Sequence, residues 1–173
     1  MRQTLRTATM AAAGFGVVMG IAAVAQLGAA SASANLAASS SVANNCTIST
    51  AALAFGAYDP VVANASANLD ASGTVTIACT KGATTTLELD LGSNASGSTR
   101  RLSDGAGTPS YLTYEIYSNA GRTTVWGTGA DAVTPAAAPS KAARNFTAYG
   151  RVPSNQDVPA GAYTDTVVAT VNF

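Results

Sequence analysis

The 173-residue sequence contains no histidine and few charged residues. Without an imidazole, neither a Ser-His-Asp nor a Cys-His catalytic group can form in this chain, and His-ligated zinc is excluded as well. Charged residues make up 10% of the chain, against about 25% in ordinary globular proteins. The 9 Lys and Arg balance the 9 Asp and Glu, so the basic excess of a nucleic-acid-binding protein is missing. We therefore expect no histidine-dependent catalysis, no cofactor and no nucleic-acid partner.

The first part of the sequence has the pattern of a secretory signal peptide. Two arginines lie within the first six residues, and residues 8–30 carry no charge. Small residues follow, with Ala-x-Ala steps that end at Ala32 and at Ala34. A basic start, an apolar run and small residues at −3 and −1 are typical of a cleaved signal. A membrane anchor is the alternative, because the run approaches the ~20 residues that span a bilayer. We expect residues 1–34 to be removed after Ala34, or after Ala32.

Cys46 and Cys79 are the only cysteines. In the oxidising compartment that a signal peptide implies, an even number of cysteines indicates a disulfide. We therefore expect this pair to be bonded, with two separate buried thiols as the alternative. Two thiols without an imidazole make a metal site improbable. The aspartates are scattered and lack the spacing of a calcium loop.

The chain after residue 73 repeatedly alternates apolar and polar residues with a period of two, which predicts β-strands. The alternating segments are residues 74–79, 86–91, 111–118, 146–151 and 166–173. Turn-forming Gly, Asn, Asp and Pro residues connect them. Residues 128–143, rich in Ala and Pro, predict a surface loop. Short alternating strands with such turns predict an all-β, antiparallel β-sandwich.

Several conspicuous side chains are interpreted as packing or as solvated groups. Aromatic residues could form a carbohydrate platform, but packing inside the sandwich and across strands is the favoured role; these residues are Trp126, Tyr111, Tyr114, Tyr117 and Tyr149. Arg100 and Arg101 predict a solvated loop, with a partner contact as the alternative. Asp165 is expected to cap or pair locally.

Two parts of the sequence look incomplete by themselves. The alternating run that reaches Phe173 has no turn or partner strand after it. At the other end, residues 35–45 form a Ser/Ala-rich segment with little to bury, which would be mobile alone. In an extended conformation one side of this segment carries Leu36, Ala38, Ser40 and Val42. The segment would be ordered by pairing with a sheet edge, either of its own domain or of a neighbour, and the pattern alone does not choose.

The chain from Cys46 to its end resembles the spore coat protein U domain, which is found in subunits of archaic, Csu-type chaperone–usher pili. The matching stretches are residues 46–49, 53–60, 73–80, 112–117, 149–153 and 161–173. The most specific of them is the ending Gly-x-Tyr-x-Asp-Thr at residues 161–166, followed by an alternating run to Phe173.

This resemblance implies that residues 46–173 form an incomplete immunoglobulin-like antiparallel β-sandwich that lacks its last strand. In the family, a periplasmic chaperone lends a strand, and the outer-membrane usher exchanges it for the N-terminal extension of the next subunit. Residues 35–45 would be this donor strand. Its inward face would carry Leu36, Ala38, Ser40 and Val42, unless a one-residue slip turns Ala37, Ser39, Ser41 and Ala43 inward. The C-terminal strand would border the acceptor groove with Tyr163, Val167, Ala169, Val171 and Phe173.

The function implied by the resemblance is that of a structural subunit of an archaic chaperone–usher pilus. It would polymerise with identical or related pilins by donor-strand exchange, for surface adhesion and biofilm formation. It would be exported by its signal peptide to the periplasm and reach the cell surface in a fimbrium. The alternative is a self-assembling spore-coat or secreted matrix protein of the same domain family. A soluble sugar-binding module or an enzyme is the least favoured class.

Overall fold

The computed structural model describes residues 28–173, so most of the predicted signal peptide lies outside the described part of the chain. Residues 28–45 contain no helix or strand, and their side chains are exposed. The folded unit comprises residues 41–173. Within the described range, no helix is long and apolar enough to cross a membrane.

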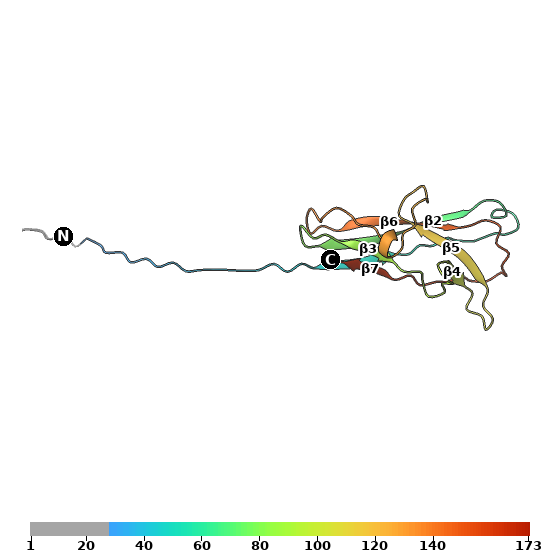
Figure 1. The fold of residues 1–173 in the computed structure, drawn as a ribbon, viewed down its shortest axis with the longest axis horizontal. Helices are drawn as coiled ribbons and strands as arrows, with labels where there is room; N and C mark the ends of the chain where they lie inside the picture. Colours follow the sequence, from blue (N-terminus) through green and yellow to red (C-terminus); the bar gives the residue numbers. More distant parts are fainter. Residues whose placement is uncertain (1–27) are drawn as a thin grey trace, which may run out of the picture. The chain divides into compact units, whose positions relative to one another are not determined.

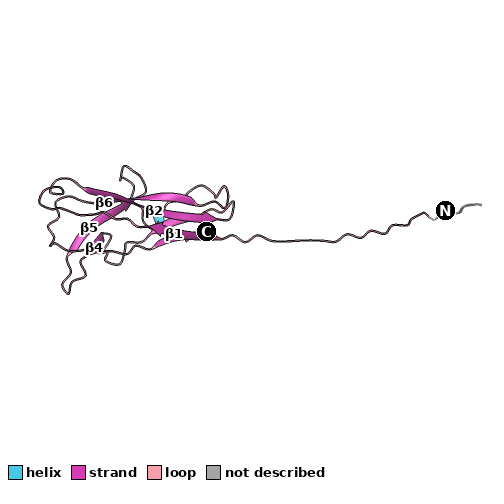
Figure 2. Cartoon of the chain, turned by 180° about the vertical axis from the view of Figure 1, so that it is seen from behind, coloured by secondary structure: helices cyan, strands magenta, loops and turns pink. Residues whose placement is uncertain are grey.

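Seven strands form two antiparallel sheets, which confirms the predicted all-β antiparallel sandwich (Figures 1 and 2). The strands are β1 (Cys46–Ala51), β2 (Leu69–Cys79), β3 (Thr86–Leu89), β4 (Arg100–Ser103), β5 (Tyr111–Tyr117), β6 (Arg144–Val152) and β7 (Ala169–Asn172), with one 3-10 turn, η1 (Gly129–Asp131). The larger sheet has the order β1-β2-β6-β5-β4, and β3 pairs with β7 in the smaller one. In this order β1 is an edge strand of the larger sheet, and β7 is an edge strand of the smaller one.

The core follows from the alternation of side chains along the strands. Buried apolar residues from β2, β3, β5 and β6 face one another between the sheets; they include Val75, Ile77, Leu87, Leu89, Leu112, Tyr114, Ile116 and Ala148. Trp126 is 1% exposed, and its indole N–H donates to the carbonyl of Leu87 at 3.0 Å. The packing role predicted for Trp126 and Tyr114 is confirmed.

The C-terminal strand begins later than the sequence predicts. β7 starts at Ala169 rather than at Thr166, because the residues before it pair with other neighbours. Thr164 exchanges two backbone hydrogen bonds with Ser103 of β4, at 2.8 and 2.9 Å. The carbonyl of Thr166 accepts from the N–H of Ser93 at 3.1 Å, in the loop after β3. The C-terminal segment therefore runs past β4 and this loop before it joins β3.

The alternation did not identify β1 or β4. β4 has the sequence Arg-Arg-Leu-Ser, which has no clear apolar period, and most positions of β1 are Ser, Thr or Ala. The prediction of a solvated loop at Arg100 and Arg101 is wrong, because both lie in β4 and the side chain of Arg100 is fully buried.

Arg100 joins β4 to the end of β3 and to the loop that carries Trp126. Its Nε and Nη2 donate to the carbonyl of Asp90 at 3.0 and 2.7 Å. Nη2 also donates to the carbonyls of Leu89 at 3.0 Å and Trp126 at 2.9 Å. Nη1 forms an ion pair with Glu115 of β5. The rigid, planar guanidinium thus donates hydrogen bonds to three backbone carbonyl groups at once.

Arg101, on the opposite face of β4, is the natural comparison. Its Nε donates to the carbonyl of Asn94 at 2.9 Å, and its guanidinium lies 3.8 Å from the ring centroid of Tyr111. These contacts are partly exposed. A cation over an aromatic ring at such a site is worth about 0.5–1 kcal/mol.

We predict that Arg100→Met lowers the free energy of unfolding by about 3–5 kcal/mol, because Glu115 and the three carbonyls lose a buried cationic partner. Arg101→Met, the matched control on the same strand, should cost only about 1 kcal/mol. Urea unfolding followed by tryptophan fluorescence of Trp126 measures both. Equal effects of the two substitutions would contradict a special role for Arg100.

Candidate strand-acceptor groove

A groove opens between the segment that contains β1 and the segment that leads into β7. It consists of two clefts with volumes of about 610 and 300 Å³. Residues 56–58, Pro60 and residues 158–161 line the larger cleft. Residues 50–52, Val167 and Ala169 line the smaller one. Both clefts share four lining residues, which form the neck between them: Leu53, Phe55, Leu102 and Asp165.

The floor of the groove is the core of the sandwich. Tyr114 and Ile116 of β5, both buried, line the smaller cleft. The side chains of Leu53 and Phe55 pack directly on Gly150 of β6. A Cβ atom added to Gly150 would lie only 2.7 Å from each of these side chains. The ring of Phe55 also meets Tyr114 edge to face, with centroids 5.8 Å apart. The groove therefore exposes an apolar interior rather than a polar surface.

The C-terminal border of the groove has unpaired backbone groups. Thr164, Thr166 and Val168 direct their backbone hydrogen bonds to β4 and to residues 90–93, away from the groove. In an extended chain, the backbone groups of the odd-numbered residues between them point the opposite way, toward the groove. Within the described part of the chain, the backbone N–H and C=O groups of Tyr163, Asp165 and Val167 have no hydrogen-bond partner. This edge is open to another strand.

The opposite border, β1, is open in the same way. The N–H of Thr80 donates to the carbonyl of Asn45 at 2.9 Å, and the register pairs Cys46 with Cys79. Hydrogen-bonded and non-bonded pairs alternate in an antiparallel ladder, so Cys46–Cys79 is a non-bonded pair. Its Cα atoms are 4.1 Å apart, close to the about 4.5 Å expected for such pairs. The backbone groups of Cys46 and Ile48 consequently point away from β2.

β1 and β7 do not pair with each other. The ladders found among the described residues join β1 to β2 and β7 to β3, and none joins β1 to β7. Two free sheet edges thus lie on either side of an apolar groove. Unpaired strand edges of this kind are templates for the addition of a strand.

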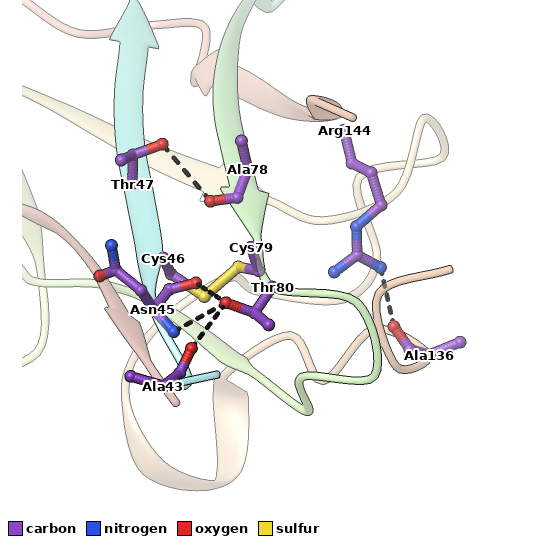
Figure 3. The surroundings of a disulfide bond; sticks show 9 residues. All are labelled: Ala43, Asn45, Cys46, Thr47, Ala78, Cys79, Thr80, Ala136 and Arg144. Atoms are coloured by element: carbon purple, nitrogen blue, oxygen red, sulfur yellow. Dashed lines mark hydrogen bonds between the residues drawn. A yellow bond between two sulfur atoms is a disulfide. The ribbon is translucent and has the colours of Figure 1, made fainter. Parts of the chain in front are cut away.

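A disulfide between Cys46 and Cys79 anchors the start of β1, as the sequence predicted (Figure 3). Figure 3 also shows Thr80, whose hydroxyl accepts from the N–H of Asn45 at 3.1 Å and lies 3.2 Å from the carbonyl of Ala43. These contacts fix residues 43–46 against the end of β2. The border of the groove is therefore held covalently at one end.

Asp165 is the charged residue at the neck, and its partners are distant in the sequence. The hydroxyl of Tyr114 donates to Oδ2 at 2.7 Å, and the backbone and side-chain amides of Asn94 donate to Oδ1 at 3.1 Å each. Gly92 has a φ of +82°, and a Cβ atom there would lie 2.0 Å from Oδ2. Local pairing of Asp165 was therefore the wrong expectation. The carboxylate ties the C-terminal segment to β5 and to the loop after β3.

The buried hydrogen bond affects the ionisation of Tyr114. Burial, and then the hydrogen bond to Asp165, raise the pKa of this phenol well above its usual value. A phenolate here would lose its hydration and would face the carboxylate of Asp165.

Three of the five C-terminal residues predicted to border the groove line it, and two lie elsewhere. Tyr163, Val167 and Ala169 line it, and Val171 packs against the core from β7. Phe173 is 54% exposed and lies beyond β7. The inward face of the predicted donor segment is exposed, including Leu36 and Val42 at 95% and 84%.

Sequence reasoning did not assign any of the four neck residues, Leu53, Phe55, Leu102 and Asp165, to the groove. Leu53 and Phe55 lie in a segment without strand alternation, and no simple signal marks them as groove residues. Asp165 could have been found, because it shares the odd-numbered face of the C-terminal segment with Tyr163 and Val167.

We predict that Cys46→Ser lowers the yield of folded protein. Loss of the cross-link between residues 33 positions apart removes about 3–4 kcal/mol of stability by the chain-entropy estimate. The yield of exported protein and its thermal unfolding measure the effect. Free thiols in the wild-type protein, together with an unchanged yield for Cys46→Ser, would contradict it.

We also predict that Tyr114 stays protonated at a pH where an ordinary tyrosine ionises, about pH 10. Because its folded pKa is raised, its contribution to stability is complete below the unfolded pKa and decreases as the pH rises through the folded one. Ultraviolet titration measures this. Tyr114→Phe should remove a late-titrating group and leave the early part of the curve unchanged; loss of an early group would contradict the prediction.

Comparison with known proteins agrees with this architecture. Residues 32–170 match the Spore Coat Protein U domain family. Protein U of Myxococcus xanthus is 36% identical over 157 residues, which cover 84% of this chain and 87% of that protein.

Two solved structures were compared as well. One is a chain of the CsuC–CsuE chaperone–tip adhesion subunit pre-assembly complex from archaic chaperone–usher Csu pili of Acinetobacter baumannii. It has a TM-score of 0.56 at 23% identity over 76% of this chain, and only 40% of that chain is covered. HdaB, the Hda pilus minor tip subunit of E. coli, has a TM-score of 0.41 at 16% identity over 72% of this chain and 79% of its own. The first similarity supports the expected immunoglobulin-like fold. By its match to the family over most of its length, the chain belongs to the Spore Coat Protein U domain family.

Proposed function

We propose that this protein is a structural, non-enzymatic subunit of an archaic chaperone–usher pilus that polymerises by donor-strand exchange. The observation that carries the proposal is the groove between β1 and β7, with an apolar floor and unpaired backbone groups on both borders. Such a site fits an added β-strand, whose backbone supplies hydrogen bonds and whose alternate side chains fill pockets. The family match and the fold shared with the Csu complex support this proposal.

The groove needs a cover because apolar side chains along it, such as Leu53, Phe55 and Val167, are only half-buried. An exposed apolar groove flanked by strand edges promotes aggregation unless something occupies it. In this proposal a periplasmic chaperone occupies it first. The outer-membrane usher then exchanges the chaperone strand for the extension of another, identical or related, subunit. The crystallised CsuC–CsuE complex is a chaperone–subunit complex by its description.

The donor in this proposal is the segment of residues 35–45. It is exposed and without strand structure in the described chain. Its residues 35–42 are available to another molecule, while Ala43 and Asn45 are hydrogen-bonded to Thr80 at the end of β2. Burial of a large apolar side chain contributes about 1.5–3 kcal/mol, and only Leu36 and Val42 are large on its even-numbered face. Together they supply about 4–5 kcal/mol by that measure. The backbone ladder along the open edges must supply the rest.

Export is part of the proposal. The disulfide between Cys46 and Cys79 fits an oxidising compartment such as the periplasm. Residues 1–34 would direct the chain there and be removed, and the fibre would then carry the subunit to the cell surface. Adhesion and biofilm formation would be functions of that fimbrium.

A second function is supported by the relative Protein U. Its 36% identity over 87% of its length, together with the family description Spore Coat Protein U domain, supports a self-assembling spore-coat or secreted matrix protein of the same domain family as the second candidate. Neighbouring genes for a periplasmic chaperone and an usher would support the pilus, and their absence would support the coat.

We predict that deletion of residues 35–44 yields a folded subunit that binds its chaperone but does not enter fibres, because the acceptor groove remains and the donor is lost. A matched pair of full-length variants refines the test: Leu36→Asp with Val42→Asp should block fibres, whereas Ala37→Asp with Ala43→Asp should not. Electron microscopy of fibres sheared from the host cells measures assembly. Long fibres from the deletion variant would show that the segment is not the donor.

A further inference from the structure

The C-terminal border of the groove carries a row of inward side chains that an added strand would contact, and one of them is charged. Its inward residues are Tyr163, Asp165, Val167 and Ala169. Asp165 is the charged member of this row, and it is flanked by an aromatic and an aliphatic side chain. An incoming strand therefore meets a carboxylate at one position and apolar groups at the others.

The carboxylate of Asp165 can accept one more hydrogen bond. A carboxylate has about four acceptor positions. Three are used: Asn94 donates twice to Oδ1, and Tyr114 donates once to Oδ2. Asp165 lines both clefts, so a strand added in the groove would pass beside this residue. An apolar residue opposite it would leave the remaining acceptor position unmet, whereas a hydroxyl would satisfy it.

The donor segment has a matching row. Its even-numbered residues are Leu36, Ala38, Ser40 and Val42, of which Ser40 is the polar member. The two central residues are small and the two outer ones are large. The groove has a corresponding form, with two clefts joined by a neck at Leu53, Phe55 and Asp165.

From this match, and resting on the proposed function, we propose that Asp165 sets the register of donor-strand exchange by accepting a hydrogen bond from Ser40 of the next subunit. The donor runs antiparallel to the C-terminal segment, as do all paired strands among the described residues. The opposing pairs, donor residue first, are Leu36–Ala169, Ala38–Val167, Ser40–Asp165 and Val42–Tyr163.

This register is the one that satisfies size and polarity together. Large residues face a small or flat partner, a small residue faces Val167, and the polar residues face each other. A shift by two residues in one direction places Val42 opposite Asp165 and Ser40 opposite Val167. The opposite shift places Ala38 against Asp165 and Ser40 against Tyr163. Both shifts leave the carboxylate facing an apolar side chain.

The backbone is compatible with this pairing and with shifts of two residues, so the side chains select the register. The free N–H and C=O groups on this border belong to Tyr163, Asp165 and Val167. In an antiparallel ladder, two directly opposed residues of a hydrogen-bonded pair exchange both bonds. Ser40 opposite Asp165 and Ala38 opposite Val167 are then hydrogen-bonded pairs, whose side chains both point to the floor.

The test uses the full-length chain in its natural host, with fibres sheared from the cells and resolved as unheated SDS ladders. Ser40→Asp places two carboxylates opposite each other and should lower the amount of polymer by roughly tenfold or more. Ser41→Asp, its neighbour on the outward face, should leave polymer at the wild-type level. Both variants should keep the Cys46–Cys79 disulfide and bind chaperone. Equal polymer from the two variants would overturn the register.

A cross-link measures the register directly. Cysteines can bond when their Cα atoms lie within about 7 Å, which holds for opposed residues and fails for diagonal ones. Ala38→Cys with Val167→Cys should therefore give reducible links between subunits, and Ala38→Cys with Ala169→Cys should not. Links from the second pair alone would show a two-residue shift.

The two proposals fail in different ways. Fibres that persist after deletion of residues 35–44 would remove the donor segment and the register together. The alternative outcome is that the deletion abolishes fibres while Ser40→Asp polymerises as well as Ser41→Asp. That result would support donor-strand exchange and contradict the proposed role of Asp165 in the register.

Discussion

The structure depends on one constraint: two sheet edges, β1 and the C-terminal segment, face the same apolar groove without pairing across it. Buried backbone groups need partners, and an apolar floor favours a cover that excludes water. A β-strand satisfies both needs at once, because it brings donors and acceptors on its edges and side chains on its face. The groove therefore fits an added strand better than it fits a small molecule or a helix.

The borders of this groove are held by a few strong contacts rather than by extensive packing. The disulfide fixes the start of β1. The carboxylate of Asp165 fixes the C-terminal segment through Tyr114 and Asn94. Behind that segment, Arg100 holds the end of β3 against β4. A groove whose walls are fixed before binding loses less conformational entropy when a strand enters. Such preorganisation would compensate for the few large side chains of the proposed donor segment.

Alternation in the sequence was sufficient to predict the sandwich and most of its core, because β2, β5 and β6 bury one face and expose the other. It failed at β4, where a buried arginine occupies a strand position that an apolar residue normally holds. Burial of Arg100 depends on carbonyls and a carboxylate that come from β3, β5 and the Trp126 loop, which no local pattern reveals. The pairing of Asp165 with Tyr114 and Asn94 was hidden for the same reason. The groove itself was anticipated only through the family resemblance, since a missing partner leaves no mark in the periodicity of the strands present.

The donor segment and the groove place opposite demands on one sequence. Before assembly, residues 35–45 must stay soluble while exposed, which favours serine and alanine over large apolar residues. In the proposed assembly, the same residues would fill a groove lined by core side chains. A short segment with large residues only at Leu36 and Val42 meets the first demand and limits what burial can contribute. Burial of large side chains therefore contributes little to fixing the register of this segment in the groove. In the proposed register the hydroxyl of Ser40 would donate to the carboxylate of Asp165, and any register that places an apolar side chain there would leave an acceptor position of this carboxylate without a partner.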